Sequence, residues 1–116
     1  MANRMKERGT IEERAVEKII QERFPDAKRT RAGRLDDEGD ILVPSADVTI
    51  QVKNAKTPQW TTWLEELADQ KRHSGMATAF LSVKRSRPGK SPLRLAVMAL
   101  EDYLDLLERA NQPHNP

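Results

Sequence analysis

The chain has 116 residues, 37% hydrophobic and 33% charged, with a formal net charge of +2. This length suits a single domain over residues 1–116 with one modest core, and we expect flexible ends at about 1–8 and 111–116. The sequence contains no cysteine and two histidines, which excludes disulfides, thiol catalysis and a zinc site. No apolar run reaches the roughly 20 residues of a membrane span, and no secretory signal is recognisable, so we expect a cytoplasmic protein.

The basic residues are concentrated in three runs, although the net charge is small. The runs contain Arg4, Lys6 and Arg8; Lys28, Arg29, Arg31 and Arg34; and Lys84, Arg85, Arg87, Lys90 and Arg94. A single charged run is as often a solvated loop as a binding surface. Three runs around one candidate site favour a polyanionic partner.

The first expected element is an amphipathic helix. Thr10 and Glu13 form a capping-box pair, and apolar residues then recur at helical spacing from Ile11 to Phe24. Residues 26–38 are polar and basic, which predicts a loop with room for a short irregular strand.

Two antiparallel strands are expected next, on either side of a turn at residues 44–47. Symmetry about this turn places Asp40 opposite Gln51, and strand alternation puts Asp40, Gln51 and Lys53 on one face. The opposite face is apolar and contains Ile41, Val43, Val48, Ile50 and Val52. A carboxylate, an amide oxygen and an ammonium group within roughly 5 Å to 8 Å suit metal-dependent cleavage of a phosphodiester.

The second half of the chain predicts a helix, two strands and a final helix. Pro58 can begin a helix that runs to about residue 73, followed by strands at 78–83 and 93–98 and a helix at 101–110. Residues 85–92 are expected to form a basic loop. The order α-β-β-α-β-β-α predicts an α/β fold with a central mixed sheet of four to five strands flanked by helices.

Three groups of residues form an ordered pattern: Glu13 in the first helix, Gly39-Asp40 at the start of a strand, and Gln51-x-Lys53 on the paired strand. This order resembles the PD-(D/E)XK nuclease superfamily, which implies a restriction-endonuclease-like core. Segments 9–13, 24–27 and 29–34 are similar to those of the small Holliday junction resolvases of archaea and phages.

The resemblance implies roles for five positions. Asp40 would be the primary ligand of Mg²⁺, for which Mn²⁺ can substitute, and Gln51, the backbone carbonyl of Val52 and Glu13 would complete the metal site. Lys53 would orient or deprotonate the attacking water, or neutralise charge in the transition state. Asp40, Gln51, Glu13 and Lys53 are therefore the catalytic candidates.

Two of these assignments leave alternatives open. Glu13 already has a structural role in the capping box, and Glu12 or Glu17 could take its place. Gln51 stands where a carboxylate is more usual, so the site has one negative charge fewer.

Residues of the helix expected after Pro58 also have alternative roles. Trp60 and Trp63 fit core or dimer packing better than base stacking, and Gln70 and Lys71 could approach the active face.

The resemblance implies a hydrolase: a magnesium-dependent endonuclease that cuts four-way DNA junctions as a homodimer, in DNA recombination and repair, encoded by a phage and working in the host-cell cytoplasm. Expected DNA contacts are Arg29, Arg31, Arg34, Lys84, Arg85 and Arg87. No glycine-rich phosphate loop is present, so no nucleotide cofactor is expected. A DNA-binding module without cleavage and another structure-specific or restriction-like nuclease are the alternatives.

Overall fold

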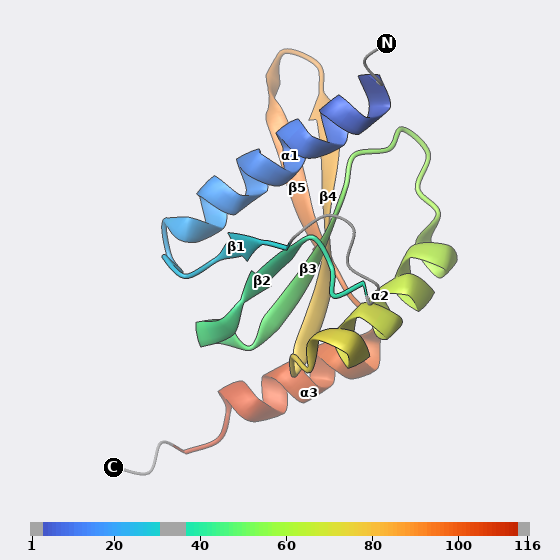
Figure 1. Ribbon diagram of the computed structural model, residues 1–116. Coiled ribbons are helices and arrows are strands. Elements are labelled where there is room, and N and C mark those ends of the chain that lie inside the picture. Colours follow the sequence, from blue (N-terminus) through green and yellow to red (C-terminus); the bar gives the residue numbers. More distant parts are fainter. Residues whose placement is uncertain (1–3, 31–36, 114–116) are drawn as a thin grey trace.

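The computed structural model describes residues 4–30 and 37–113 and contains one five-stranded sheet with three helices (Figure 1). The elements are α1 (Arg4–Gln21), β1 (Lys28–Arg29), β2 (Ile41–Val43), a 3₁₀ turn η1 (Pro44–Ala46), β3 (Val48–Lys53), α2 (Trp60–Ser74), β4 (Thr78–Arg87), β5 (Lys90–Val97) and α3 (Leu100–Ala110). The strand order is β1-β2-β3-β4-β5, and β3 and β4 are the parallel pair. This arrangement confirms the expected α/β class and mixed sheet.

The β2–β3 hairpin has the register that the sequence predicts, but it stops one residue early. Ile41 pairs with Ile50, and the pairing continues to the turn. Asp40 is not paired directly with Gln51, which corrects the expected geometry. Its N–H instead donates to the carbonyl of Ile50 at 2.9 Å, because Gly39, with φ of +98°, turns the chain out of the strand.

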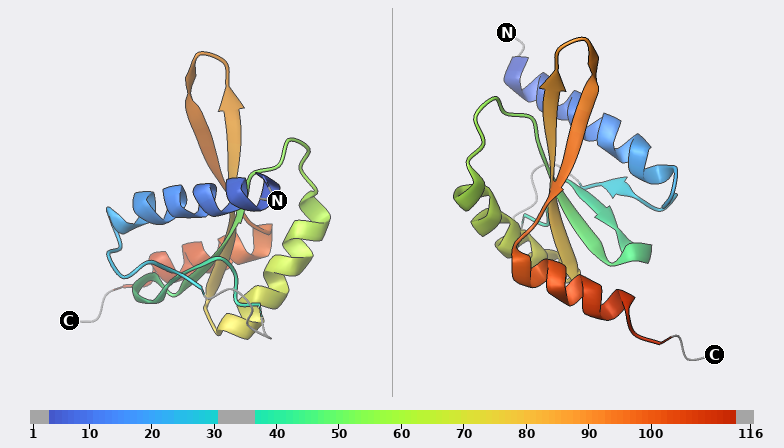
Figure 2. Two further views of the ribbon diagram at one scale, coloured as in Figure 1. Left: turned by 45° about the horizontal axis from the view of Figure 1, so that its top comes forward. Right: turned by 180° about the vertical axis from the view of Figure 1, so that it is seen from behind.

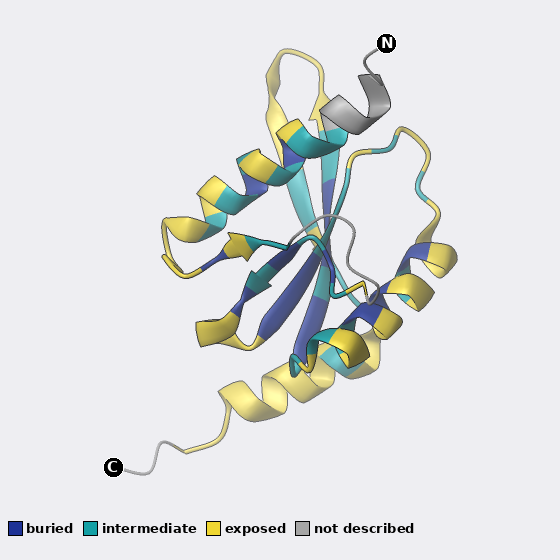
Figure 3. Cartoon of the chain, in the orientation of Figure 1, coloured by how far each residue is buried: buried dark blue, intermediate teal, exposed yellow. Residues whose placement is uncertain are grey.

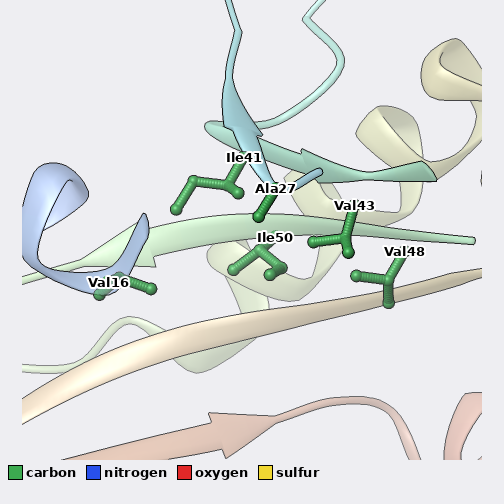
Figure 4. Close-up of a cluster of buried hydrophobic side chains, with 6 residues drawn as sticks. All are labelled: Val16, Ala27, Ile41, Val43, Val48 and Ile50. Atoms are coloured by element: carbon green, nitrogen blue, oxygen red, sulfur yellow. The ribbon is translucent and has the colours of Figure 1, made fainter. Parts of the chain in front are cut away.

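The first core cluster lies between α1 and one face of the sheet (Figure 4). It consists of Val16, Ala27, Ile41, Val43, Val48 and Ile50, with Ile20, Val52 and Phe80 packed against it. The alternating apolar residues of β2 and β3 therefore form a buried face, as predicted.

A second core cluster covers the opposite face, where the sequence predicted an exposed polar surface. It contains Trp63, Leu67, Ala79, Leu81 and Val83, so α2 packs on this side of β3 and β4. Because β4 pairs in parallel with β3, Gln51 and Lys53 of β3 lie beside the apolar residues Leu81 and Val83 of β4. The buried tryptophan, Trp63, therefore packs in the core.

Both early helices begin at residues other than those predicted. α1 begins at Arg4, so Thr10 lies inside the helix and the capping-box interpretation is wrong. The preceding arginine, methionine, lysine and glutamate residues are good helix formers, and they extend the helix across Gly9. α2 begins at Trp60, two residues after Pro58.

The expected basic loop at 85–92 is instead the tip of a long β4–β5 hairpin, which projects from the sheet (Figure 2). Gly89, with φ of +67°, allows the tight turn after Pro88. Pro92 is tolerated in β5 because this is an edge strand, which leaves one side of its backbone unpaired. We call residues 84–94 the basic arm.

A buried ion pair connects this arm to α1. The guanidinium of Arg94 donates two hydrogen bonds of 2.9 Å to Glu12, whose side chain is buried. Arg94 is therefore a structural residue, and Glu12 is already occupied and cannot replace Glu13 in a site.

Within the described ranges 4–30 and 37–113, no helix is long and apolar enough to cross a membrane.

Candidate functional site

Asp40 lies where β1, β2 and β3 meet. Its carboxylate accepts a hydrogen bond of 2.8 Å from the N–H of Val52, and its own carbonyl accepts one of 3.0 Å from the N–H of Thr30. The residue before it is fixed equally well, since the hydroxyl of Thr30 donates to the carbonyl of Gly39 at 2.6 Å. Asp40 is thus held by backbone contacts on both sides.

The Asp40 carboxyl has a pKa close to neutral pH. Its pKa is raised from 3.8 to about 7, chiefly by burial, and the hydrogen bond from Val52 only partly opposes this. The charge of Glu13, a hydrogen bond with the Glu13 side chain and the charge of Asp37 contribute smaller parts of the increase. Three carboxyl groups therefore influence one another here, and a cation would relieve their repulsion.

Glu13 is the acid of α1 that approaches Asp40, as the sequence predicted. Its carboxylate also forms an ion pair of 3.0 Å with Arg29, a residue expected to contact DNA. The backbone N–H of Arg29 donates to Glu17 at 3.0 Å, so β1 is attached to α1 at two points. Arg29 is thus paired with a site acid, and its role as a DNA contact stays a prediction.

Gln51 carries an unsatisfied acceptor. Its side-chain oxygen Oε1 is buried and has no hydrogen-bond partner. A buried amide oxygen without a donor costs on the order of 1–3 kcal/mol, so such an atom in a polar site indicates a missing ligand. Gln51 precedes Val52, whose N–H binds Asp40, so the backbone of Gln51 is next to the residue that holds the Asp40 carboxylate.

Lys53, at the end of β3, has two contacts with α2. Its ammonium lies 3.6 Å from the carboxylate of Glu66 and 5.3 Å from the centre of the Trp63 ring. Its side chain is only 18% exposed, so the charge is held near the sheet instead of extending into solvent. These contacts fix the ammonium at the same end of β3 as the acids.

The structure adds Asp37 and His73 to the site and brings Gln70 to it, as the sequence suggested. Asp37 accepts a hydrogen bond of 2.8 Å from the amide of buried Gln70 and one of 2.9 Å from the N–H of Gly39. His73 Nδ1 lies 3.0 Å from the Asp37 carbonyl. The end of α2 thus holds the turn before Asp40.

Lys71, the neighbour of Gln70, does not join this group. Its ammonium forms an ion pair of 3.0 Å with Asp102 of α3, so it connects two helices.

The donor set fits a hard divalent cation in part. Among the described residues, no cluster of three or more His, Cys, Asp or Glu side chains has the geometry of a metal site. The acids Asp40 and Glu13 and the orphan oxygen of Gln51 are nevertheless oxygen donors of the kind that Mg²⁺ prefers. The backbone carbonyl of Val52, the other expected ligand, belongs to the same strand end.

The expected DNA contacts have different outcomes. Arg31 and Arg34 lie outside the described residues. Lys84, Arg85 and Arg87 lie on the basic arm; Arg85 donates weakly to carbonyls of residues 55 and 56 at 3.4 Å, and Arg87 to the carbonyl of Ser91 at 2.9 Å. Lys53 pairs with Val83 in the register, so the arm begins beside the candidate site.

No known protein family, curated protein or solved structure matches this chain. The fold and the site together define an α/β protein with interacting carboxyl groups at one end of β3, a half-buried lysine at the same strand end and a projecting basic arm (Figure 2).

Proposed function

We propose that the protein is a metal-dependent DNA endonuclease with a nuclease-like PD-(D/E)XK core. The observation that carries the proposal is the convergence at one end of β3: a carboxyl with its pKa raised to about 7, an orphan amide oxygen on the next strand, and a lysine two residues further along. A second carboxyl, that of Glu13, approaches from α1. This combination of groups suits phosphodiester hydrolysis.

Asp40, Glu13 and Gln51 would hold the cation, with the carbonyl of Val52. A bound Mg²⁺ or Mn²⁺ would stabilise charge on the phosphate and lower the pKa of an attacking water. Lys53 would orient that water or neutralise charge developing on the phosphate oxygens. Arg29 balances the charge of Glu13 before a substrate arrives.

The basic arm supports DNA as the substrate. Lys84, Arg85 and Arg87 come directly after Val83, the residue of β4 that pairs with Lys53. A DNA strand whose phosphates bind along the arm would therefore reach the site. We propose a four-way junction as the preferred substrate, in DNA recombination or repair, because a two-fold dimer would present two sites to the two equivalent strands of a junction.

Cleavage assays with Mg²⁺ and with Mn²⁺ on junction, flap, single-stranded and duplex DNA test the proposal. We expect Asp40→Ala and Lys53→Ala to reduce the cleavage rate by on the order of 10²–10³-fold. The matched control is Lys56→Ala, because Lys56 is an exposed lysine in the loop after β3. Unchanged cleavage by the two site variants would overturn the proposal, and preferential cutting of linear duplex would replace the junction by another substrate.

Gln51 gives a narrower test of the metal site. Gln51→Glu should strengthen Mn²⁺ binding, because it replaces a neutral donor by a charged one, and Gln51→Ala should weaken it. Titration calorimetry with Mn²⁺ alone measures both without DNA. Equal affinity in wild type and both variants would remove Gln51 from the site.

A DNA-binding module without cleavage is the second candidate, and specific contacts favour it. Lys53 is paired with Glu66, Glu13 is paired with Arg29, and the described residues contain no three-acid metal cluster. Retained junction binding with no cutting of any substrate, in either metal, would select this function.

A further inference from the structure

Helix α3 leaves its apolar side uncovered. Leu100, Tyr103, Leu104 and Leu107 recur at the spacing of one helical face, yet none of the side chains from Leu100 to Ala110 is buried. Figure 3 shows the helix as exposed along nearly its whole length. An amphipathic helix normally buries such a stripe, so this side of α3 is missing a partner.

An apolar groove of about 480 Å³ lies next to this helix, between α3 and the end of α1. Its lining includes the buried core residues Val43, Val48 and Ile50, so the groove borders the first core cluster. Leu106 of α3 also lines the groove, which makes the groove and the exposed helix face continuous.

The combined surface is large enough for a stable contact. We define the apolar patch by six side chains that are each 36–47% exposed: Ile19, Phe24, Tyr103, Leu104, Leu106 and Leu107. At roughly 180 Å² for a large apolar side chain, these exposed fractions sum to roughly 450–500 Å². A standard interface buries about 800 Å² on each partner including its polar rim, and a patch of this size can form its centre.

Charge complementarity identifies the occupant. The exposed charges of α3 are mainly acidic, with three acids and one base: Glu101, Asp105, Glu108 and Arg109. The end of α1 presents the bases Lys18 and Arg23 with one acid, Glu22. A two-fold axis would place α3 of each copy over the groove of the other, so that acids meet bases twice.

We infer that the apolar patch is the surface through which two copies of this chain form a symmetric dimer, with α3 of each copy packed against the groove between α1 and α3 of the other. The inference deepens the proposed function, since it gives the second copy a surface, and its role at a junction rests on that proposal. The association itself needs neither DNA nor metal.

Sedimentation equilibrium of the full chain at micromolar concentration tests the inference. We expect wild type to have twice the mass of one chain and Leu104→Glu to be monomeric, because a charge at the centre of the patch would be buried unpaired. The matched control is Leu93→Glu, since Leu93 in the basic arm is 44% exposed, close to the 47% of Leu104, and lies outside the patch. This control should remain dimeric.

Circular dichroism establishes that each variant is folded. If Leu104→Glu fails to fold, Leu104→Gln replaces it, and its dimer should be at least about tenfold weaker, the equivalent of about 1.4 kcal/mol. A monomeric wild type would overturn the inference and leave the patch to a different protein. Dimers unaffected by the Leu104 substitution would overturn the choice of surface.

Mass measured without DNA separates this inference from the proposed function. A monomer that cleaves DNA would disprove the dimer and retain the nuclease. A dimer that cleaves no DNA would retain the dimer and disprove the nuclease.

Discussion

The two ends of β3 differ in chemistry. Lys53 ends the strand beside the carboxylate of Glu66 and two residues after Gln51, whose side-chain oxygen is unsatisfied, whereas Val48 begins it at the lining of an apolar groove. At the polar end, burial and then the neighbouring carboxyl groups raise the pKa of Asp40. At the apolar end, leucine side chains of α3 meet water.

The difference shows that each end requires a different kind of partner. A bound cation reduces the repulsion between carboxyl groups. An uncovered apolar stripe is instead removed from water by packing against another apolar surface. Cation binding and dimerisation should therefore be separable, because the contacts that serve them lie at opposite ends of one strand.

The largest expected effect on stability comes from removing the ionisable carboxyl of Asp40 at the polar end. Between pH 4 and pH 7, folded Asp40 holds a proton that the unfolded chain has lost, so the free energy of unfolding should fall as pH rises. Asp40→Asn removes this cost and keeps the acceptor for Val52. We expect the variant to be more stable than wild type at pH 8, by at most about 4 kcal/mol, and equally stable below pH 4.

Urea denaturation in the presence of a chelator measures this difference at both pH values. A stability difference of the same size at pH 8 and below pH 4 would contradict the electrostatic origin. Added Mg²⁺ should then stabilise wild type at pH 8 more than Asp40→Asn, because only wild type offers the second carboxylate.

The backbone before Asp40 provides the second prediction. A Cβ at Gly39 would collide with Thr49 Oγ1 and lie 3.3 Å from the carbonyl of Ile50, and φ there is +98°. Gly39→Ala should therefore lower the free energy of unfolding by about 3 kcal/mol. The control is Gly75→Ala, where φ is +71° and no atom lies within 4 Å, so the loss should be about 1 kcal/mol. Equal losses in thermal or urea unfolding would exclude the close contact.

The smallest expected effect concerns the basic arm. If Lys84 contacts a phosphate, Lys84→Ala should weaken binding of all junction sequences alike and reduce the slope of log affinity against log salt by about 1. Arg72→Ala is the control, because Arg72 is exposed on α2 and paired with Asp69. A salt series of fluorescence anisotropy measures both, and an unchanged slope for Lys84→Ala would exclude the contact.

The hairpin register and the apolar face of β2 and β3 could be predicted because both depend on neighbours in the sequence. The ends of the elements were less predictable. Thr10 fitted a helix cap but lies inside α1, and residues 85–92 fitted a loop but extend two strands. In both cases long-range pairing or good helix formers outweighed a local signal.

The candidate site was partly predictable for the same reason. Asp40, Gln51 and Lys53 are close in sequence, so the hairpin brings Asp40 to the end of β3 that carries Gln51 and Lys53, although Asp40 itself lies just before the paired residues of β2. Asp37 and Gln70 are 33 residues apart, and Arg29 and Glu13 are 16 apart, so no local pattern could pair them.

The sequence by itself determined the α/β class, the apolar face of the hairpin and the presence of the polar residues Asp40, Gln51 and Lys53 in the hairpin. These features follow from periodicity and turn residues, which depend on only a few neighbouring positions. Only the tertiary structure decided that α2 covers the polar face, that Arg29 neutralises Glu13, and that α3 remains uncovered. These outcomes depend on how elements pack across the sheet, and packing is a property of the folded chain as a whole.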